Sequence, residues 1–190
     1  MSDATSPLAL ARTFLFVPGD RPERYTRALA SGAGAVIVDL EDAVAPDRKD
    51  TARTQIAEGF ATLPSDAHGR LLVRVNASDT PWHADDCALV ARLAAQRLLV
   101  GVVLPKAERA TDLTALAQAV GPATALLPLI ESVAGLDAVD TLAASPQVLR
   151  LVFGHLDFQA DAGMACGPDE AELVPVRLAL VLASRRAGLA

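Results

Sequence analysis

Two acidic residues follow apolar runs of this sequence, at positions where a charged side chain needs a partner. Glu131 comes directly after the run Ala125–Ile130, and Asp157 lies shortly after the run Leu149–Phe153. A carboxylate at the end of a buried strand is costly unless it is paired or bound to a metal ion. Magnesium prefers one or two protein carboxylates together with water and substrate oxygens. We therefore interpret Glu131 and Asp157 as candidate Mg²⁺ ligands.

Arg74, within the apolar run Leu71–Val75, could bind an anionic substrate. A guanidinium group can hold a carboxylate through two parallel hydrogen bonds. A divalent ion and such an arginine suit a 2-oxo acid such as oxaloacetate. The metal can chelate its keto oxygen and act as a Lewis acid while a carbon–carbon bond breaks. The simpler alternatives are that Arg74 only neutralises Glu41 or Asp42, and that Glu131 is a structural ion-pair partner.

Lys106 and His155 offer two other kinds of chemistry. Lys106 follows the run Gly101–Leu104, and it could form a Schiff base with a carbonyl substrate. We favour an ion pair with Glu131 or a neighbouring acid, because a lysine beside several acids stays charged. His155 could act as an acid or a base, but we favour a solvated histidine or one behind the site.

These residues need a scaffold that brings distant parts of the sequence together. Apolar runs of strand length alternate with helical patterns, and most runs are continuously apolar, as in strands buried on both faces. The predicted strands are Thr13–Val17, Ala35–Leu40, Leu71–Val75, Gly101–Leu104, Ala125–Ile130 and Leu149–Phe153. The predicted helices are Pro22–Ala30, Arg48–Phe60, Trp82–Ala95, Ala107–Ala119, Val133–Ala143 and Asp169–Ala187.

This alternation predicts a parallel sheet with right-handed crossovers, either a (β/α)8 barrel or an open doubly wound sheet. No G-x-G-x-x-G motif follows the first run, which disfavours a dinucleotide-binding open sheet. We therefore predict an α/β fold, a (β/α)8 TIM-type barrel with about six βα units present, as a single incomplete domain over residues 1–190. In such a barrel the carboxyl ends of the strands share one rim, where sites are built. The polar residues that should meet there are Asp39, Glu41, Asp42, Arg74, Asn76, Lys106, Glu131, His155 and Asp157.

Some residues have the chemistry of helix starts. Asp20 and Glu23 have the spacing of a capping box, and Thr80 followed by Pro81 predicts an N-cap and a first helical position. Pro168, followed by two acids, predicts the start of the last helix.

Composition narrows the partners and the compartment. The 190 residues are 52% hydrophobic and carry a net charge of −6, which provides no basic surface for nucleic acid. Two cysteines, Cys87 and Cys166, are too few for a disulfide framework and fit a reducing cytoplasm. We expect both to be passive thiols. We expect no signal peptide, no transmembrane span and no membrane partner.

Motifs across nearly the whole chain occur in the order of a known family. The most specific of these motifs is Asp-Leu-Glu-Asp-Ala-Val-Ala-Pro, at residues 39–46. The full set of segments is Arg12–Gly19, Val38–Pro46, Val73–Asn76, Leu104–Lys106, Leu129–Ser132 and Gly154–Asp157. With these motifs, the chain resembles the citrate lyase beta-subunit-like enzymes of the HpcH/HpaI aldolase/citrate lyase superfamily.

The resemblance implies a barrel, usually a homotrimer, that uses Mg²⁺ to cleave citryl-CoA, malyl-CoA or citramalyl-CoA. The products are an acyl-CoA and a 2-oxo acid. The resemblance implies that Glu131 and Asp157 are the metal ligands, and we expect Glu131 to bind the substrate as well. It implies that Arg74 binds the substrate carboxylate.

The resemblance also concerns two further pairs of residues. Glu41 and Asp42 resemble a second acidic pair near the metal-bound waters, and we assign them the catalytic proton transfer. Pro18 and Gly19 are similar to the turn that lines the acyl-CoA entrance. Family members continue beyond the last predicted helix with further barrel units, so we expect the first and last predicted strands to be open edges.

Three other functions are compatible with the same residues. Thioester hydrolysis could use the same metal site, and a metal-independent aldolase could form a Schiff base on Lys106. A non-catalytic acyl-CoA-binding subunit is the third.

Overall fold

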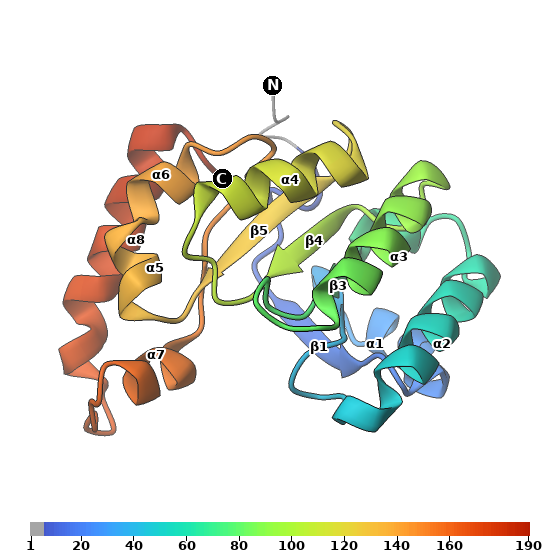
Figure 1. Cartoon of the computed structure of the whole chain (residues 1–190), viewed down its shortest axis with the longest axis horizontal. Helices are drawn as coiled ribbons and strands as arrows, with labels where there is room; N and C mark the ends of the chain where they lie inside the picture. The colour runs from blue at the N-terminus through green and yellow to red at the C-terminus, as the bar shows by residue number, and fades with distance from the viewer. Residues whose placement is uncertain (1–5) are drawn as a thin grey trace.

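A computed structural model of the chain describes residues 6–190 and contains one parallel sheet. The six strands pair in the order in which they occur in the sequence, and the sheet curls into part of a barrel (Figure 1). This confirms the predicted α/β class and an incomplete (β/α)8-type barrel. The strands are β1 (Phe14–Pro18), β2 (Ala35–Asp39), β3 (Leu71–Arg74), β4 (Gly101–Leu104), β5 (Ala125–Ile130) and β6 (Val152–Phe153).

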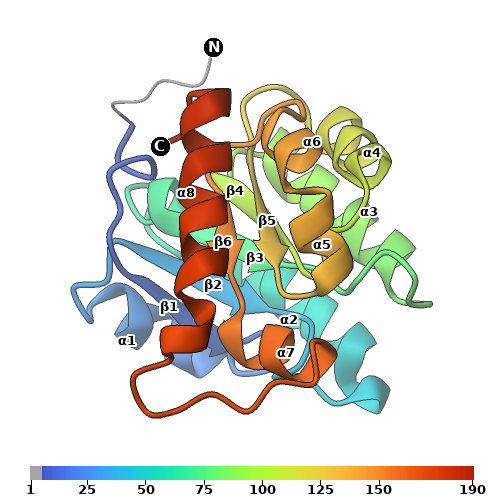
Figure 2. The same ribbon diagram turned by 90° about the vertical axis from the view of Figure 1, so that its left-hand side faces the viewer.

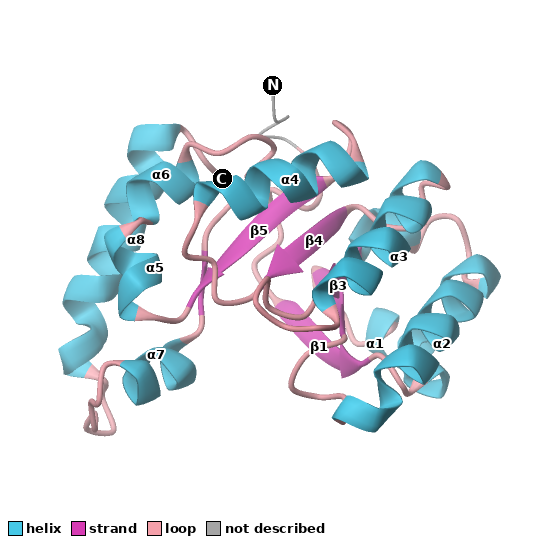
Figure 3. Cartoon of the chain, viewed as in Figure 1, coloured by secondary structure: helices cyan, strands magenta, loops and turns pink. Residues whose placement is uncertain are grey.

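Helices surround the outside of the strands (Figure 3). The α-helices are α1 (Tyr25–Leu29), α2 (Lys49–Thr62), α3 (His83–Ala95), α4 (Ala110–Val120), α5 (Val133–Asp137), α6 (Val139–Ala143), α7 (His155–Asp161) and α8 (Val174–Ala187). Short 3-10 helices are η1 (Pro22–Arg24), η2 (Pro46–Arg48), η3 (His68–Arg70) and η4 (Ala171–Leu173). No helix among residues 6–190 is long and apolar enough to span a membrane.

Strands β2 to β5 are buried on both faces, as their continuous apolar runs predict, whereas the outer strands β1 and β6 are partly exposed. Successive side chains of a strand point to opposite faces. Val36 and Val38 pack outward with the helices, whereas Ile37, Leu72 and Leu129 belong to a separate inner cluster inside the curl. This alternation decides which polar residues at the strand ends face the interior.

The segment at residues 8–11 closes the amino-terminal end of the curl. Leu8, Ala9 and Ala11 are buried in the inner cluster. The Arg150 guanidinium donates to the carbonyl oxygens of Ala9 and Ala11, both at 2.7 Å. Because the opposite, carboxyl end of the strands carries the polar residues, the inner cluster separates the two ends.

Some predicted element boundaries are wrong. The predicted helix Val133–Ala143 is two helices, α5 and α6, that meet at Ala138. The predicted strand Leu149–Phe153 is reduced to the two residues of β6. Helix α7, which carries Asp157, has no counterpart in the prediction.

The predicted helix caps are also wrong. Asp20 accepts a hydrogen bond from Arg48 Nε at 2.8 Å instead of capping a helix, and η1 begins after Arg21. Thr80 Oγ1 donates to the carbonyl oxygen of Ala77 at 2.7 Å, and α3 begins only at His83. The last helix has its early proline at Pro175, not at Pro168. Asp20 and Thr80 thus bind partners other than the helix starts they were predicted to cap, and Pro168 lies before the first turn of the last helix.

The two outer strands of the sheet have one neighbour each. β1 pairs with β2 and β6 pairs with β5, so both are edges, as predicted. Helix α8 runs along the outside of the sheet near β6 (Figure 2). Its exposed apolar side chains are Val174, Leu178, Val181 and Leu182.

Candidate functional site

Three charged side chains enter the curl from the carboxyl ends of neighbouring strands. Asp39 and Arg74 end β2 and β3 and are partners in the sheet register, and Glu131 directly follows β5. Each lies two residues after a member of the inner cluster, namely Ile37, Leu72 and Leu129. Because side chains alternate along a strand, the three charges face the interior above an apolar floor.

Arg74 is held by two acids. Its Nε and Nη2 donate to Asp39 Oδ1 and Oδ2 at 2.7 and 2.6 Å, a bidentate pair. Its Nη1 lies 2.7 Å from Glu41 Oε2 and 3.7 Å from Asp42 Oδ2. Burial disfavours the charged guanidinium, but the bonds to Asp39 and the nearby acids outweigh this and raise its pKa. Arg74 is therefore a fixed cation.

The orientation of Arg74 leaves a donor free for a ligand. The ring of Phe16 lies 5.0 Å from the guanidinium carbon, a distance at which a cation and an aromatic face attract each other. Asp39 accepts one N–H from Nη2, so the second N–H of Nη2 remains for another acceptor, whereas Nη1 lies beside Glu41. The contact with Glu41, which was an alternative to substrate binding by Arg74, is present, and Asp39 is a further partner whose role was not predicted.

Glu41 and Asp42 have different environments although they are adjacent. Glu41 is 7% exposed, whereas Asp42 is exposed. The contact of Glu41 Oε2 with Arg74 is not aligned as a hydrogen bond, and that buried oxygen has no hydrogen-bond partner among the described residues. Burial raises the pKa of Glu41 to about 7, against the effect of Arg74 and with added repulsion from nearby acids. Glu41 can therefore exchange a proton near neutral pH.

Glu131 and Asp157 approach each other at the rim. Glu131 is 3% exposed, and its Oε1 accepts the backbone N–H of Lys106 at 2.8 Å. Burial raises the pKa of Glu131 to about 7; the Lys106 N–H opposes this shift and the charge of Asp157 adds to it. In the described part of the chain, no group of three or more His, Cys, Asp and Glu side chains could hold a metal ion. Two carboxylates fit Mg²⁺, which takes its remaining ligands from water and substrate.

The backbone around Glu131 is shaped to receive its side chain. Gly154 has no Cβ, and one added there would lie 2.5 Å from Glu131 Oε2 and 2.8 Å from Glu131 Cβ. Lys106 adopts a positive φ of 45°, which accompanies the donation of its N–H to Glu131. Ser132 caps α5 by accepting the N–H of Gly135 at 3.1 Å. The Lys106 N–H thus holds one carboxylate oxygen of Glu131, and Gly154 leaves room for the other.

Pro18 and Gly19 lie directly beside Asp39. The Gly19 N–H donates to the Asp39 carbonyl oxygen at 2.8 Å, and the Tyr25 hydroxyl donates to the Gly19 carbonyl oxygen at 2.6 Å. A Cβ atom at Gly19 would meet the Asp39 carbonyl oxygen at 2.7 Å, so the close approach requires glycine. The turn is therefore fixed at the rim, next to Arg74 and its partner.

Other candidates have structural partners. The Lys106 side chain is exposed, and its contact with Glu131 runs through the backbone N–H instead of the predicted ion pair. His155 begins α7, and its Nε2 lies 3.2 Å from Glu170 Oε1. Cys87 lies 3.3 Å from His83 Nε2, and burial raises its pKa to about 11, so it remains a thiol at neutral pH.

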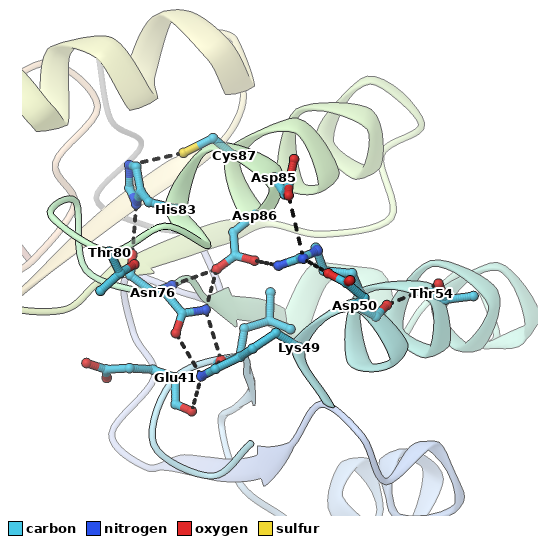
Figure 4. A network of polar contacts seen from close by, with 12 residues as sticks. Glu41, Lys49, Asp50, Thr54, Asn76, Thr80, His83, Asp85, Asp86 and Cys87 are labelled. Carbon is cyan, nitrogen blue, oxygen red and sulfur yellow. Dashed lines mark hydrogen bonds and ion pairs between the residues drawn. The ribbon is translucent and has the colours of Figure 1, made fainter. Parts of the chain in front are cut away.

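A polar network behind Glu41 was not anticipated from the sequence. Lys49, Asn76 and Asp86 are buried together, and Figure 4 shows them linked by hydrogen bonds beside Glu41. Lys49 is one of only two lysines, and Asn76 follows a predicted strand, so the sequence offered a reason to consider both as functional residues. Asp86 lies in a predicted helix, where nothing distinguishes it from a surface acid.

The chain is a protein of the β/α-barrel class. It has paired carboxylates and a buried arginine at the carboxyl ends of its parallel strands. Within that class, residues 12–190 match the HpcH/HpaI aldolase/citrate lyase family. The chain belongs to this family. The match confirms the resemblance seen in the motifs.

Named relatives agree with this assignment. The chain is 33% identical over 178 residues to a (3S)-malyl-CoA thioesterase of Cereibacter sphaeroides, covering 94% of this chain and 60% of that protein. It is 37% identical over 163 residues to an L-malyl-CoA/beta-methylmalyl-CoA lyase from the same species, covering 80% of this chain and 51% of that protein. The chain therefore spans less than two thirds of the length of these relatives.

A solved structure has the same fold. The citrate lyase beta subunit from Mycobacterium tuberculosis, complexed with oxaloacetate and magnesium, superposes with a TM-score of 0.77 at 32% identity. The similarity covers 96% of this chain and 78% of that one.

Proposed function

We propose that this chain carries the site of a Mg²⁺-dependent carbon–carbon lyase. Its substrate would be a thioester of the malyl-CoA, citryl-CoA or citramalyl-CoA type, and its products an acyl-CoA and a 2-oxo acid. The observation that carries the proposal is the buried Glu131 carboxylate beside Asp157, on the same rim as Arg74. The names of the lyase relative and of the oxaloacetate- and magnesium-bound neighbour support the same chemistry.

Glu131 and Asp157 are the residues that would hold the magnesium ion. Glu131 Oε2 and the Asp157 carboxylate have no hydrogen-bond donor in the described part of the chain, so both are free to act as ligands. When bound, the ion would polarise the keto oxygen of the 2-oxo acid as a Lewis acid. The N–H of Lys106 keeps Glu131 Oε1 in place.

Arg74 would bind the carboxylate of the oxo-acid portion. Its guanidinium is oriented by Asp39 and Phe16, and it keeps an N–H group on Nη2 that neither residue uses. A donor that is already oriented loses little conformational freedom when the substrate binds. Arg74 would thereby place the bond to be broken near Glu41.

Glu41 would take the proton of the substrate hydroxyl. As that proton leaves, the hydroxyl carbon becomes a carbonyl. The electron pair of the broken carbon–carbon bond passes to the thioester α-carbon, which then takes up a proton. A base works best when its pKa lies near the operating pH, and the pKa of Glu41 is about 7. Asp42, which is exposed, would act through water.

The remaining expectations concern the partners of the chain. Pro18 and Gly19 would line the entrance for the acyl-CoA, because their turn is fixed beside Asp39. Assembly as a homotrimer is a further expectation.

Thioester hydrolysis is a second candidate, because one relative is named a (3S)-malyl-CoA thioesterase. It would use the same metal and the same arginine, but water would attack the thioester carbonyl and release CoA, and the carbon–carbon bond would stay intact. A Schiff base on Lys106 receives less support, since an exposed lysine lacks the desolvation that usually activates such residues.

Titration calorimetry with oxaloacetate tests the metal site. We expect binding in Mg²⁺ and none in EDTA. Glu131→Gln should weaken Mg²⁺ binding by at least about tenfold, because a neutral amide replaces a ligand carboxylate. Glu58→Gln removes an exposed charge on α2 and should bind like the unaltered chain. Oxaloacetate binding that persisted in EDTA would rule out the metal-dependent mechanism.

A further inference from the structure

Lys49, the first residue of α2, is buried beside the segment that carries Glu41. It is 4% exposed, and its Nζ donates to the carbonyl oxygens of Leu40 and Glu41 at 2.6 and 2.7 Å and to Asn76 Oδ1 at 2.8 Å. An ammonium group has three N–H donors, so all of them are used. Figure 4 shows the side chain reaching from α2 to Glu41 and Asn76.

The partners of Lys49 are unusual for a buried cation. No carboxylate among the described residues forms a salt bridge with its Nζ, and two of its three acceptors are backbone carbonyls. Burial lowers its pKa, while the more distant Asp39 and Asp86 oppose that shift. A lysine present only to neutralise charge would pair with an acid directly. This lysine instead binds the carbonyl oxygens of the two peptide groups on either side of the Glu41 Cα atom.

The Glu41 segment is thus held from two directions. Asp39 Oδ1 and Oδ2 accept the N–H groups of Glu41 and Ala43 at 2.9 and 3.1 Å, and the Leu40 N–H donates to the Arg74 carbonyl oxygen at 2.9 Å. Lys49 binds the carbonyl oxygens of Leu40 and Glu41. The N–H and C=O groups of Glu41 are thus both hydrogen-bonded, which holds its backbone beside Arg74.

Asn76 and Asp86 fix Lys49 in turn. Asn76 Nδ2 donates to the Leu40 carbonyl oxygen at 3.0 Å and to Asp86 Oδ2 at 2.6 Å, and the Asn76 N–H reaches the same Asp86 oxygen at 2.8 Å. Asp86 is 0% exposed, and its other oxygen accepts Arg53 Nη1 at 2.8 Å. The network therefore anchors Lys49 to α3 and to the end of β3.

We propose that Lys49 is a positioning residue that sets Glu41 opposite Arg74 by holding the Leu40 and Glu41 carbonyl oxygens. The proposal rests on the proposed function only for the consequence in catalysis. Lys49 touches no carboxylate of the site, so it acts through the backbone of Glu41. Loss of the Lys49 side chain should leave substrate binding by Arg74 largely intact and impair the proton transfer that Glu41 performs.

The test compares Lys49→Met with Arg53→Met. Arg53 lies one turn further along α2 and contacts Asp86, but it contacts neither Leu40, Glu41 nor Asn76, so it is a matched control for loss of a cation from the network. We expect Lys49→Met to accelerate amide hydrogen exchange at Glu41 and Ala43 by at least about tenfold, with Ile37 unchanged. With malyl-CoA as the probe, kcat should fall about 10- to 100-fold while KM changes little. Arg53→Met leaves the three contacts of Lys49 in place, so it should change both readouts less than Lys49→Met does.

Several outcomes would overturn the proposal. Unchanged exchange at Glu41 and Ala43 in Lys49→Met would show that the segment does not need the lysine. Equal effects of Lys49→Met and Arg53→Met would show that the network only stabilises the fold. If Lys49→Met fails to fold, Asn76→Ser, which removes one of the three acceptors of Lys49, should still raise exchange at Glu41. No increase there would contradict the proposal.

The same experiment separates this inference from the proposed function. If the unaltered chain does not cleave malyl-CoA, the lyase proposal is weakened, but the exchange measurement still decides whether Lys49 holds Glu41.

Discussion

Glu41 is the side chain on which the chemistry of the site depends most directly at the residue scale. It is buried, it lies against one arginine, and one of its oxygens lacks a hydrogen bond among the described residues. Burial of a carboxyl group favours its neutral form. The same environment that suits Glu41 to proton transfer therefore reduces the stability of the folded chain once Glu41 ionises.

This cost predicts a pH dependence of stability. The pKa of Glu41 is raised from 4.5 to about 7 in the folded chain, so the native state keeps a proton that the unfolded state releases. The stabilisation is full below pH 4.5 and is lost as the pH rises through about 7. We therefore compare the free energy of unfolding of the unaltered chain with that of Glu41→Gln, both in EDTA. The difference should decline between pH 4.5 and about 7 and stay level above pH 7.

Glu131 has a shift of the same sign, but it is present in both proteins and largely cancels in the difference. A difference between the two proteins that did not change with pH would contradict the assignment of the shift to Glu41.

Individual residues were only partly predictable from the sequence. Arg74 among acids was anticipated, because charged residues follow buried strands. The choice between Glu41 and Asp42 was not, since it depends on how Asp39 and Lys49 hold the backbone between them. Both residues are near Glu41 in the sequence, but their hydrogen bonds to it depend on how the loop folds and how α2 packs, which no sequence pattern specifies.

At the scale of elements, the carboxyl ends of the strands supply the site and the loops close around it. Gly154, between β6 and α7, has no side chain and so leaves room for the Glu131 side chain at the end of β5. Its φ of −92° is one that any residue adopts, so glycine is required there for space and not for conformation. The contact couples the positions of the two proposed metal ligands.

Gly154→Ala should therefore impair metal binding specifically. The added Cβ would lie 2.5 Å from Glu131 Oε2, which forces the carboxylate or α7 to move. We expect Mg²⁺ affinity to fall by at least about tenfold, with a loss of folding stability of about 1–3 kcal/mol from overpacking. Calorimetry with Mg²⁺ and thermal unfolding measure the two effects.

Gly69→Ala provides the control, because a Cβ atom at Gly69 meets no atom within 4 Å. That variant should match the unaltered chain in both measurements. Unaltered Mg²⁺ affinity in Gly154→Ala would contradict the role of Gly154 in placing Glu131.

The elements themselves were largely predictable, because long apolar runs mark buried strands. Strand β5 matches its predicted bounds, Ala125–Ile130. Helix α7 was missed because its seven residues include one buried side chain, Phe158, and so show no helical period. The cap at Thr80 failed because its hydroxyl bonds to Ala77, a competition that propensity does not include.

At the scale of the whole molecule, the chain forms part of a barrel, and its two outer strands have one neighbour each. The family assignment follows from residues 12–190, and the order of the strands was predicted from the alternation of runs. Single-domain organisation and a homotrimer remain predictions. The relatives are longer than this chain, which covers 60% of the (3S)-malyl-CoA thioesterase. Whether this shorter chain has the proposed lyase activity is therefore the question that decides the proposed function.

Product analysis after incubation of the purified chain with malyl-CoA and Mg²⁺ tests the central claim most directly. A carbon–carbon lyase should release acetyl-CoA and glyoxylate in equal amounts. The reaction should stop in EDTA, and Glu131→Gln should slow it by at least about a hundredfold, because the residue is a proposed metal ligand. Release of free CoA and malate instead would identify hydrolysis of the thioester and contradict carbon–carbon cleavage, as would the absence of any turnover.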